Sequence, residues 1–492
     1  MDVLPQLSKR PVMRFLALVV LLTWTTHLAP MANAVLDLDL WWHLRDGDAI
    51  VAQHAFPHQG VFSQLASSPW AAYSWGFEVL LSRFYHWFGL VGLVGMRTGL
   101  EVAITLVLFI ILRRASGGFW RAWALAAVGM WAMHHCLALQ PMLLSILMFT
   151  IEVGLIFEAR SRGNIRLLFL MPVLFLVWAN LHIQFIYGLF VLALLTGVCL
   201  VRPMLPKSWS TALELEHELP VSSVLAVAGL SLMGTLIGPY SWHLYAVILG
   251  YVRSSAPFSL IVELQAPDFR SPEHFILLLI VAGAFFTLGW QRCRDPFKLA
   301  LLVVSALVAF RMQRDSWFVC IPALTMIAER KLATAEEAVV SRARAWTFAA
   351  VTAFATLLVL LMTAWDSKVD NPSLERALAG YFPVRACEFV RKATFPVPIY
   401  NNMNWGGFLI WSLPGYPVAI DGRTDLYGDE VLTRYSRVEQ GAPQWSSDPD
   451  LLASRLVLLD RRTQLAALLY HDPRFQLLYE DPLAVVFLRN TR

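Results

Sequence analysis

The sequence has few charged residues. Asp, Glu, Lys and Arg make up 15% of its 492 residues, whereas soluble domains carry roughly 25%. The deficit is concentrated in apolar runs such as 119–133 and 185–201. Each run approaches the ~20 apolar residues that cross a bilayer core. This composition excludes an ordinary soluble protein and indicates a membrane protein with many spans.

Cysteine is also scarce, and none of the residues shows a CxxC or other metal-binding spacing. Only Cys387 lies well inside the polar C-terminal tail, which excludes a disulfide within that tail. The net charge of +4 does not indicate nucleic-acid binding, because the basic residues flank apolar segments. The five cysteines are Cys136, Cys199, Cys293, Cys320 and Cys387.

The apolar segments predict about eleven spanning helices. Lys and Arg cluster at alternate turns between them, and the positive-inside rule then places the N-terminus in the cytoplasm and the C-terminus outside. The run ending at Ala34 could instead be a cleaved signal peptide. We favour an uncleaved span, because it would hold the acidic segment at Asp37 against the membrane. The predicted spans are 13–33, 88–112, 119–137, 142–158, 166–182, 184–201, 221–238, 274–290, 297–312, 316–329 and 345–365.

The chain is therefore predicted to be mostly α, with a transmembrane domain at 1–366 and a small α/β domain at 367–492. Outer loops are expected at 35–87 and 238–275. Short apolar runs in the tail suit buried strands. These runs are 396–400, 408–411, 418–420, 456–459 and 485–488, and helices are expected at 448–454 and 461–471.

The most informative motif, Asp37-Leu38-Asp39, directly follows the first predicted span. Its carboxylates could hold a divalent cation such as Mg²⁺ or Mn²⁺ against a phosphate, because hard cations take oxygen ligands. One carboxylate could instead act as a general base on an acceptor hydroxyl. The alternative is a solvated loop start with a tryptophan anchor. Possible substrate-binding neighbours, by sugar stacking or phosphate hydrogen bonds, are Trp41, Trp42, His43 and Arg45.

Further polar residues lie at the same predicted membrane face. Glu263 and Asp268 belong to the second outer loop, and His182, Arg311 and Arg314 lie near the ends of spans. Cationic donors would suit a lipid phosphate that carries a sugar. The alternatives are solvated loop acids, a hydrogen-bonded packing histidine, and arginines that extend to the interface.

An acidic D-x-D-type motif after the first span, in a many-span chain with a C-terminal outer domain, resembles the GT-C class. These are membrane glycosyltransferases that use polyprenyl-phosphate or polyprenyl-diphosphate sugars. The continuation Trp41-Trp42-His43-Leu44-Arg45 with Phe56-Pro57, Trp70 and Glu78 looks like uncharacterised bacterial members. The resemblance implies that Asp39, and less strongly Asp37, are catalytic and metal-associated. It also implies that an acid from a later loop, Glu263 or Asp268, completes the site.

The tail segment 400–410, followed by Asp421, is loosely similar in placement to the W-W-D-Y-G block of oligosaccharyltransferase catalytic subunits. Its first three positions hold Met403, Asn404 and Trp405, so recognition of a protein acceptor does not carry over. Asp421 and Arg423 could bind an acceptor or form a structural ion pair, and we favour the ion pair.

We therefore predict a membrane glycosyltransferase in the bacterial cell envelope. It would transfer a sugar from a polyprenyl-phosphate carrier, at the outer face of the inner membrane, to a glycan, lipid or protein acceptor. The alternatives are a non-catalytic scaffold or assembly protein, and a transporter of lipid-linked or small solutes. A transporter would favour charges near the bilayer middle and internal repeats, which the sequence does not show. The enzyme reading predicts that the two acidic loops build one site.

Overall fold

The computed structural model describes residues 11–66, 68–204, 206, 219–329, 342–393, 395 and 398–490. The chain divides into two compact units. Unit 1 comprises Met1–Met31, Arg97–Gly238 and Glu263–Val369. Unit 2 comprises Ala32–Met96, Pro239–Val262 and Asp370–Arg492. Some basic residues used for the topology prediction lie outside the described residues, namely Lys9, Arg10, Lys207, Arg330 and Lys331.

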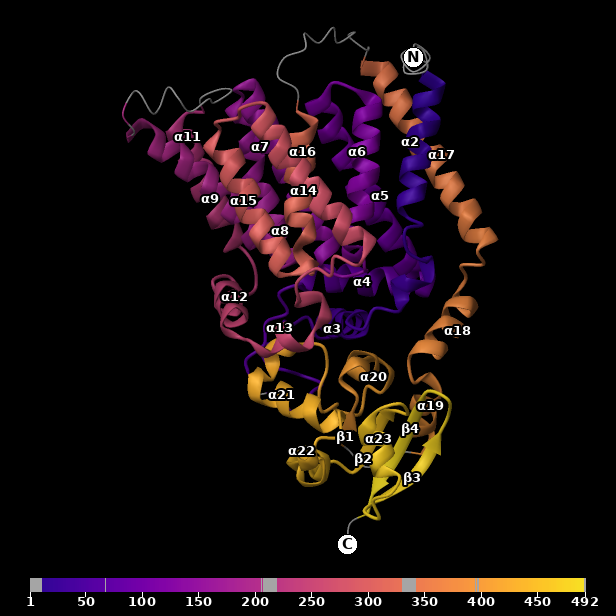
Figure 1. Cartoon of the computed structure of the whole chain (residues 1–492). Coiled ribbons are helices and arrows are strands. Elements are labelled where there is room, and N and C mark those ends of the chain that lie inside the picture. Colours follow the sequence, from indigo (N-terminus) through magenta and orange to yellow (C-terminus); the bar gives the residue numbers. More distant parts are fainter. Residues whose placement is uncertain are drawn as a thin grey trace. The chain divides into compact units, whose positions relative to one another are not determined.

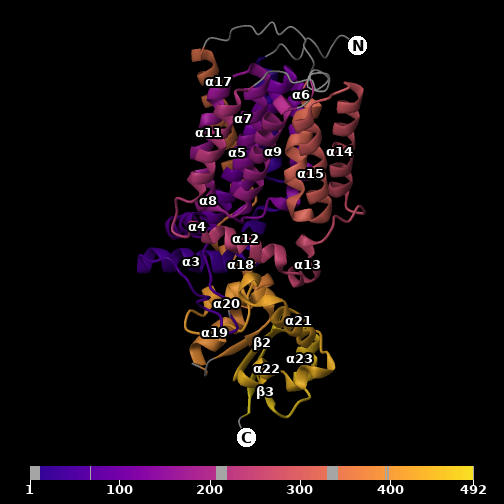
Figure 2. The same cartoon turned by 90° about the vertical axis from the view of Figure 1, so that its left-hand side faces the viewer.

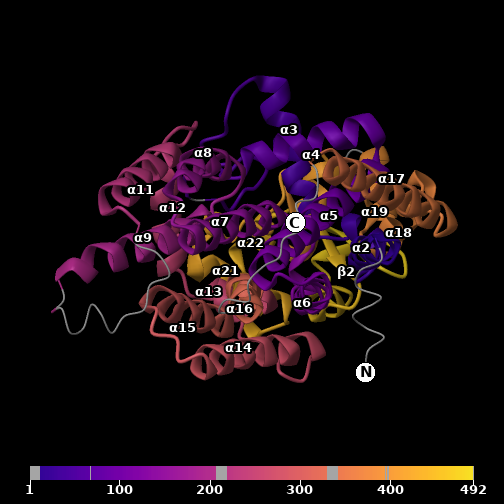
Figure 3. The same ribbon diagram turned by 90° about the horizontal axis from the view of Figure 1, so that it is seen from above.

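Unit 1 is a bundle of apolar helices (Figure 1). Within it, α14 and α15 both pack against α16, and the view from above draws these helices next to one another (Figure 3). The helix α5 (Leu90–Ser116) begins in unit 2 and continues into unit 1. The other α-helices of unit 1 are α2 (Pro11–Thr25), α6 (Phe119–Ala132), α7 (Met142–Arg162), α8 (Met171–Leu181), α9 (Phe185–Val201), α11 (Val221–Thr235), α14 (Pro272–Trp290), α15 (Pro296–Arg311), α16 (Ser316–Ala328) and α17 (Arg342–Asp366).

Each of the eleven predicted spans overlaps one of these helices. Among the described residues, five helices are long and apolar enough to cross a membrane. This supports a membrane protein, whereas the number of crossings and their orientation stay a prediction. The five long segments are Leu90–Ser116, Met142–Arg162, Phe185–Met204, Pro272–Trp290 and Ala349–Asp366.

Charged side chains inside unit 1 form close ion pairs. Arg97 Nε lies 3.0 Å from Glu101 Oε1, and Arg160 Nη2 lies 2.7 Å from Asp295 Oδ2. All four side chains are almost fully buried. Pairing offsets the free-energy cost of placing charged side chains in an apolar bundle. We therefore assign these four residues a structural role.

Unit 2 contains a four-stranded mixed sheet in the order β1-β2-β4-β3. The strand β1 (Ile399–Asn401) runs parallel to β2 (Leu456–Asp460). Antiparallel pairing joins β2 to β4 (Ala484–Arg489) and β4 to β3 (Phe475–Glu480). The small α/β domain is thus confirmed. Its helices are α18 (Asn371–Tyr381), α19 (Val384–Ala393), α20 (Gly406–Ser412), α21 (Gly428–Glu439), α22 (Pro449–Ala453) and α23 (Gln464–Leu469).

The tail differs from the prediction in three places. The predicted strand at 408–411 is the helix α20, which packs against α3 of the same unit. The short apolar run has no period of its own, so tertiary packing decides its conformation. The strand β3 was missed because its middle residues are exposed and give no buried apolar run. The run 418–420 forms only isolated bridges, through Val418 to Ser63 and to Ile399.

The predicted outer loops are largely helical. Residues 35–87 contain α3 (Leu40–Gln53) and most of α4 (Trp75–Phe88). These two helices pack against each other (Figure 2). An added Cβ at Gly47 would overlap the Glu78 carbonyl oxygen, so only glycine permits this close approach. The second loop contains α12 (His243–Arg253) and α13 (Ala256–Leu260). Unit 2 therefore joins parts of both loops to the tail, whereas the topological division at residue 366 stays a prediction.

Candidate active site

The acidic motif stands at the N-terminus of α3. Asp37 Oδ1 accepts hydrogen bonds from the backbone N–H groups of Asp39, at 2.9 Å, and Leu40, at 3.1 Å. These are donors that a helix start leaves without intrahelical partners. Asp37 therefore supports the start of α3. Because the N-terminus of a helix attracts negative charge, the same position favours carboxylates and phosphates.

Asp39 is held by contacts on two sides. Its Oδ1 accepts a hydrogen bond of 3.0 Å from Trp42 Nε1, one turn along α3. An added Cβ at Gly422 would overlap the same oxygen. The Asp39 carboxylate is thus seated directly against the backbone of a segment almost four hundred residues away in sequence, and only glycine at position 422 leaves room for it.

The segment that carries Gly422 is fixed by a buried ion pair. Arg423 donates from Nε to Asp421 Oδ1 and from Nη2 to Asp421 Oδ2, both at 2.9 Å. The Tyr427 hydroxyl also donates to Asp421, at 2.7 Å. Burial opposes the charge on Asp421, but the Arg423 guanidinium and these hydrogen bonds hold its pKa below the usual range. The structural ion pair favoured from the sequence is present.

The Arg423 guanidinium also faces aromatic rings. Its Cζ lies 4.7 Å from the centre of the Trp70 ring and 5.8 Å from that of Trp42, within the range of a cation–π contact. Since Trp42 also donates to Asp39, one cluster joins the ion pair to the acidic motif.

Two further carboxyl groups, Asp46 and Glu78, are buried in this cluster. Neither oxygen of Asp46 has a hydrogen-bond partner among the described residues. Burial raises the pKa of Asp46 to about 8, against the attraction of Arg423. Burial and the nearby Asp46 carboxyl raise the pKa of Glu78 well above its usual range. Sequence reasoning missed Asp46, although an acid on the apolar side of a helix, next to a glycine, was a visible signal.

The aromatic and basic neighbours of the motif lie on α3, mostly on its buried face. The Trp41 ring is enclosed, with Phe408 at 5.4 Å between ring centres, so it offers no free face to a sugar ring. His43 Nδ1 and Glu78 Oε1 form a buried hydrogen bond of 3.0 Å, which gives His43 a packing role. Arg45 is only partly buried. The segment was predicted as part of the outer loop 35–87, so its helical conformation was not expected.

A second polar group lies in unit 1. A cavity of about 210 Å³ is lined by Glu263, Arg314 and Gln140, among others. Arg314 Nε lies 3.9 Å from Glu263 Oε2, and its Nη2 donates to Gln140 Oε1 at 3.3 Å. The structure thus brings together two residues predicted from separate segments. The cavity thus contains an acid, Glu263, next to Arg314, whose guanidinium group is of the kind that binds phosphate oxygens.

Three other predicted residues do not line this cavity. His182 is buried and shares a hydrogen bond of 2.8 Å with Ser145 Oγ. Asp268 is exposed, and its carboxylate accepts from the backbone N–H of Arg270 at 3.0 Å. Arg311 is exposed at the end of α15. Asp37 and Asp39 belong to unit 2, so a single site built from both acidic loops stays a prediction.

No protein-family model and no curated protein sequence matches the chain. Among solved structures, it is similar to the oligosaccharyltransferase AglB from Archaeoglobus fulgidus, in complex with an inhibitory peptide and a dolichol-phosphate. The TM-score is 0.54 at 10% identity, over 91% of this chain and 69% of AglB. The chain has the GT-C fold. A weaker similarity, with a TM-score of 0.47 at 14% identity over 97% of both chains, is to ArnT from Cupriavidus metallidurans bound to undecaprenyl phosphate.

The GT-C fold confirms the resemblance drawn from the sequence at the level of architecture. Sequence identity this low establishes nothing about individual residues.

Proposed function

We propose that the protein is a glycosyltransferase that moves a sugar from a polyprenyl-phosphate or polyprenyl-diphosphate carrier to an acceptor, with Asp39 as its central carboxylate. The observation that carries this proposal is the seating of Asp39 at the N-terminus of α3, between Trp42 and Gly422. Its support is the fold shared with AglB, whose structure contains a dolichol-phosphate. Because one fold occurs in proteins with different activities, the proposed reaction rests on the residues of the site.

The proposed reaction needs one base. The acceptor hydroxyl oxygen bonds to the anomeric carbon, and the bond from that carbon to the carrier phosphate oxygen breaks. The phosphate leaves with the bonding electrons, and Asp39 takes the proton from the acceptor hydroxyl. The hydrogen bond from Trp42 holds the carboxylate in one orientation, and fixed geometry of this kind lowers the entropic cost of reaching the transition state.

A divalent cation, Mg²⁺ or Mn²⁺, is part of the proposal. Asp37 and Asp39 are the residues that would hold it, and it would neutralise charge on the departing phosphate. Asp37 Oδ1 is already occupied by two backbone N–H groups. Among the described residues there is no group of three or more His, Cys, Asp or Glu side chains arranged around one point. With only these two carboxylates as protein ligands, a cation held here would have to complete its shell with substrate phosphate and water, as Mg²⁺ commonly does.

Glu263 and Arg314 are proposed to bind the carrier phosphate. Arg314 would donate to phosphate oxygens, and Glu263 would orient its guanidinium. Trp42 stays a proposed substrate neighbour, while His43, His182, Asp268 and Arg311 are given no catalytic step. Arg45 lines a second cavity.

We further propose that the reaction takes place at the outer face of a bacterial inner membrane. The alternation of Lys and Arg between spans supports this orientation. Alkaline phosphatase fused after Arg492 should then be active, because that enzyme works only when exported. A fusion that is inactive but present in the membrane would contradict the orientation.

The decisive test is sugar transfer by the full-length protein in lipid nanodiscs. The donor is an undecaprenyl-phosphate sugar, membrane lipids and glycans extracted from the host supply the acceptor hydroxyl, and mass spectrometry measures released undecaprenyl phosphate. We expect Asp39→Asn to lower turnover at least ~10²-fold, the lower range for a general acid or base. Glu430→Gln, an exposed acid in the same unit, is the matched control and should retain turnover. Equal turnover in Asp39→Asn and wild type would refute the assignment and favour the scaffold alternative.

A further inference from the structure

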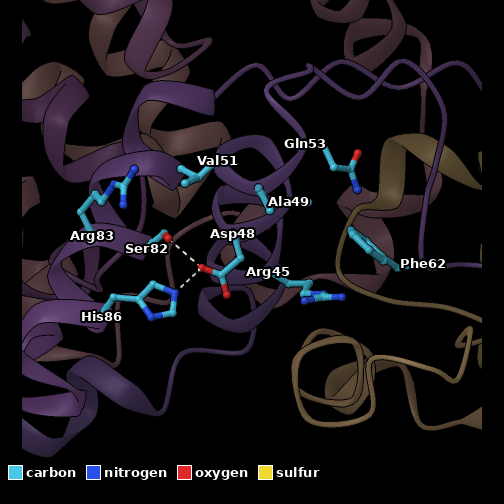
Figure 4. A pocket seen from close by; sticks show the side chains of 10 residues that line it. Arg45, Asp48, Ala49, Val51, Gln53, Phe62, Ser82, Arg83 and His86 are labelled. Carbon is cyan, nitrogen blue, oxygen red and sulfur yellow. Dashed lines mark hydrogen bonds and ion pairs between the residues drawn. The ribbon is translucent and has the colours of Figure 1, made fainter.

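Unit 2 contains a second candidate binding site, away from the Asp39 carboxylate. An open cavity of about 400 Å³ lies between the later turns of α3 and the later turns of α4 (Figure 4). Its volume falls in the ~300–1,000 Å³ range of ligand pockets. Asp48, which lines it, is ~13 Å further along the axis of α3 than Asp39, at ~1.5 Å per residue. The cavity is therefore separate from the proposed reaction centre but on the same rigid helix.

A carboxylate is fixed in this cavity. Asp48 Oδ1 accepts a hydrogen bond from Ser82 Oγ at 2.7 Å and pairs with His86 Nε2 at 2.9 Å (Figure 4). The other oxygen, Oδ2, makes no hydrogen bond with the described residues, and the side chain remains partly exposed. A carboxylate that is held through one oxygen presents the other as an acceptor, which suits a ligand with hydroxyl groups.

Two arginines line the same cavity. Arg45 Nε is buried and has no hydrogen-bond partner among the described residues. Arg83 is exposed and forms no ion pair or hydrogen bond with them either. Two guanidinium groups outnumber the single Asp48 carboxylate, so the cavity carries a surplus of positive charge. The fork of N–H donors on each guanidinium matches a carboxylate or phosphate.

The cavity wall includes an aromatic residue with a strained backbone. Phe62 has φ 77°, in the left-handed region that bulky side chains rarely adopt. The conformation is retained because the Phe62 carbonyl accepts from the backbone N–H of Val418 at 3.0 Å. The Cζ of Arg45 lies 5.6 Å from the centre of the Phe62 ring. Backbone strain of this kind gathers at ligand sites, and here it keeps an apolar wall beside the guanidinium.

We propose that this cavity binds a sugar residue that carries a negative charge, either a carboxylate or a phosphate. Asp48 and the Gln53 amide would bind hydroxyl groups, Phe62 would cover an apolar face, and Arg45, which lies on the Phe62 side of Asp48, would bind the anionic group (Figure 4). Arg83 lies on the other side of Asp48 and would add to the positive charge of the cavity. The choice of a carbohydrate rests on the proposed function. The choice of an anion rests on the surplus of guanidinium groups alone.

Saturation-transfer NMR and calorimetry on the full-length protein in nanodiscs test this proposal, because both measure binding of small ligands directly. The probes are methyl glucuronide, glucose 6-phosphate, neutral methyl glucoside and inorganic phosphate. We expect one or both charged sugars to bind at least ~10-fold more tightly than methyl glucoside and inorganic phosphate, since charged hydrogen bonds are the strong ones. Glucuronide preference would identify a carboxylate site, and 6-phosphate preference a phosphate site.

Variants locate the binding. Arg45→Gln should weaken binding of the charged sugar ~10-fold and Arg83→Gln should weaken it by a smaller factor, and Asp48→Asn should reduce the advantage of the charged sugar over inorganic phosphate. Arg462→Gln, an exposed arginine outside the cavity, is the control and should bind as wild type does. Because Arg83 is exposed, its substitution leaves the fold intact, and thermal unfolding verifies this. Asp39→Asn should lose sugar transfer yet keep this binding, which separates failure of the proposed function from failure of the site.

Three results would overturn the proposal. These are equal binding of methyl glucoside and the charged sugars, inorganic phosphate binding as tightly as glucose 6-phosphate, or unchanged affinity in both arginine variants.

Discussion

Asp39 and Glu263 were both predicted as site acids, but their surroundings differ. Asp39 accepts from an indole N–H and lies in contact with the backbone at Gly422. Glu263 has a side chain that is 54% exposed, and the Arg314 nitrogen near it is 3.9 Å away. The first carboxylate is held in place before any ligand arrives, whereas the second can change its position at little cost. Two acidic residues that were both predicted in outer loops therefore differ in mobility, because different neighbours surround their carboxylates.

The largest loss of turnover should come from a substitution that fills the space occupied by the Asp39 carboxylate. Gly422→Ala places a methyl group where the carboxylate oxygen lies, so the side chain has to move away from its position. We expect turnover to fall ~10²-fold, because even small displacements of a catalytic group are costly. Sugar transfer in nanodiscs measures this.

The control for that variant is Gly415→Ala, since nothing lies within 4 Å of the added methyl group at that exposed turn. Wild-type turnover in Gly422→Ala, with the protein correctly folded, would mean that the seating of Asp39 is irrelevant to activity. The contrast with Glu263 would then disappear.

A smaller effect is expected at the exposed acid. Glu263→Gln should lower kcat/KM ~10-fold, mostly through KM, because a flexible acid that only orients Arg314 contributes to binding of the carrier. Asp366→Asn, an exposed acid of the same unit, serves as control. A loss as large as that of Asp39→Asn would instead assign Glu263 to the chemical step.

The buried neighbour of Asp39 should affect stability rather than turnover, and the sign depends on pH. Burial raises the pKa of Asp46 to about 8 in the folded protein, from the 3.8 that is ordinary for this carboxyl group. Between pH 3.8 and about 8 the Asp46 carboxyl is protonated in the folded protein and ionised in the unfolded chain. The free energy of unfolding therefore falls as the pH rises toward 8. Because one proton of difference changes the free energy of unfolding by ~1.4 kcal/mol per pH unit, the loss over the three units between pH 5 and pH 8 should be ~3–4 kcal/mol.

Asp46→Asn removes that titration. The melting temperature of the variant should fall less than that of the wild type between pH 5 and pH 8, in parallel thermal unfolding series. Identical pH profiles would show that Asp46 is ionised in both states and that its burial has no energetic consequence.

Part of the site was predictable from short sequence patterns. Asp37 and Asp39 follow an apolar run directly, so their place after the first helix needed no tertiary information. The pair Asp421 and Arg423 is two residues apart, and its ion pair was foreseen. By contrast, the helix α3 was missed, because its apolar residues were read as interfacial anchors and not as the buried side of an amphipathic helix. Its partners α4 and α20 come from distant segments.

The apolar helices of the bundle, the acidic motif and the α/β character of the C-terminal domain could all be predicted from the sequence. These follow from runs and periodicities that act over neighbouring residues. Only the tertiary structure decided that Gly422 faces Asp39, that Glu263 meets Arg314, and that Asp48, Arg45 and Arg83 line one cavity. Such contacts depend on which helix faces pack together. No local pattern encodes that choice, because each face buries its apolar side chains equally well against many partners.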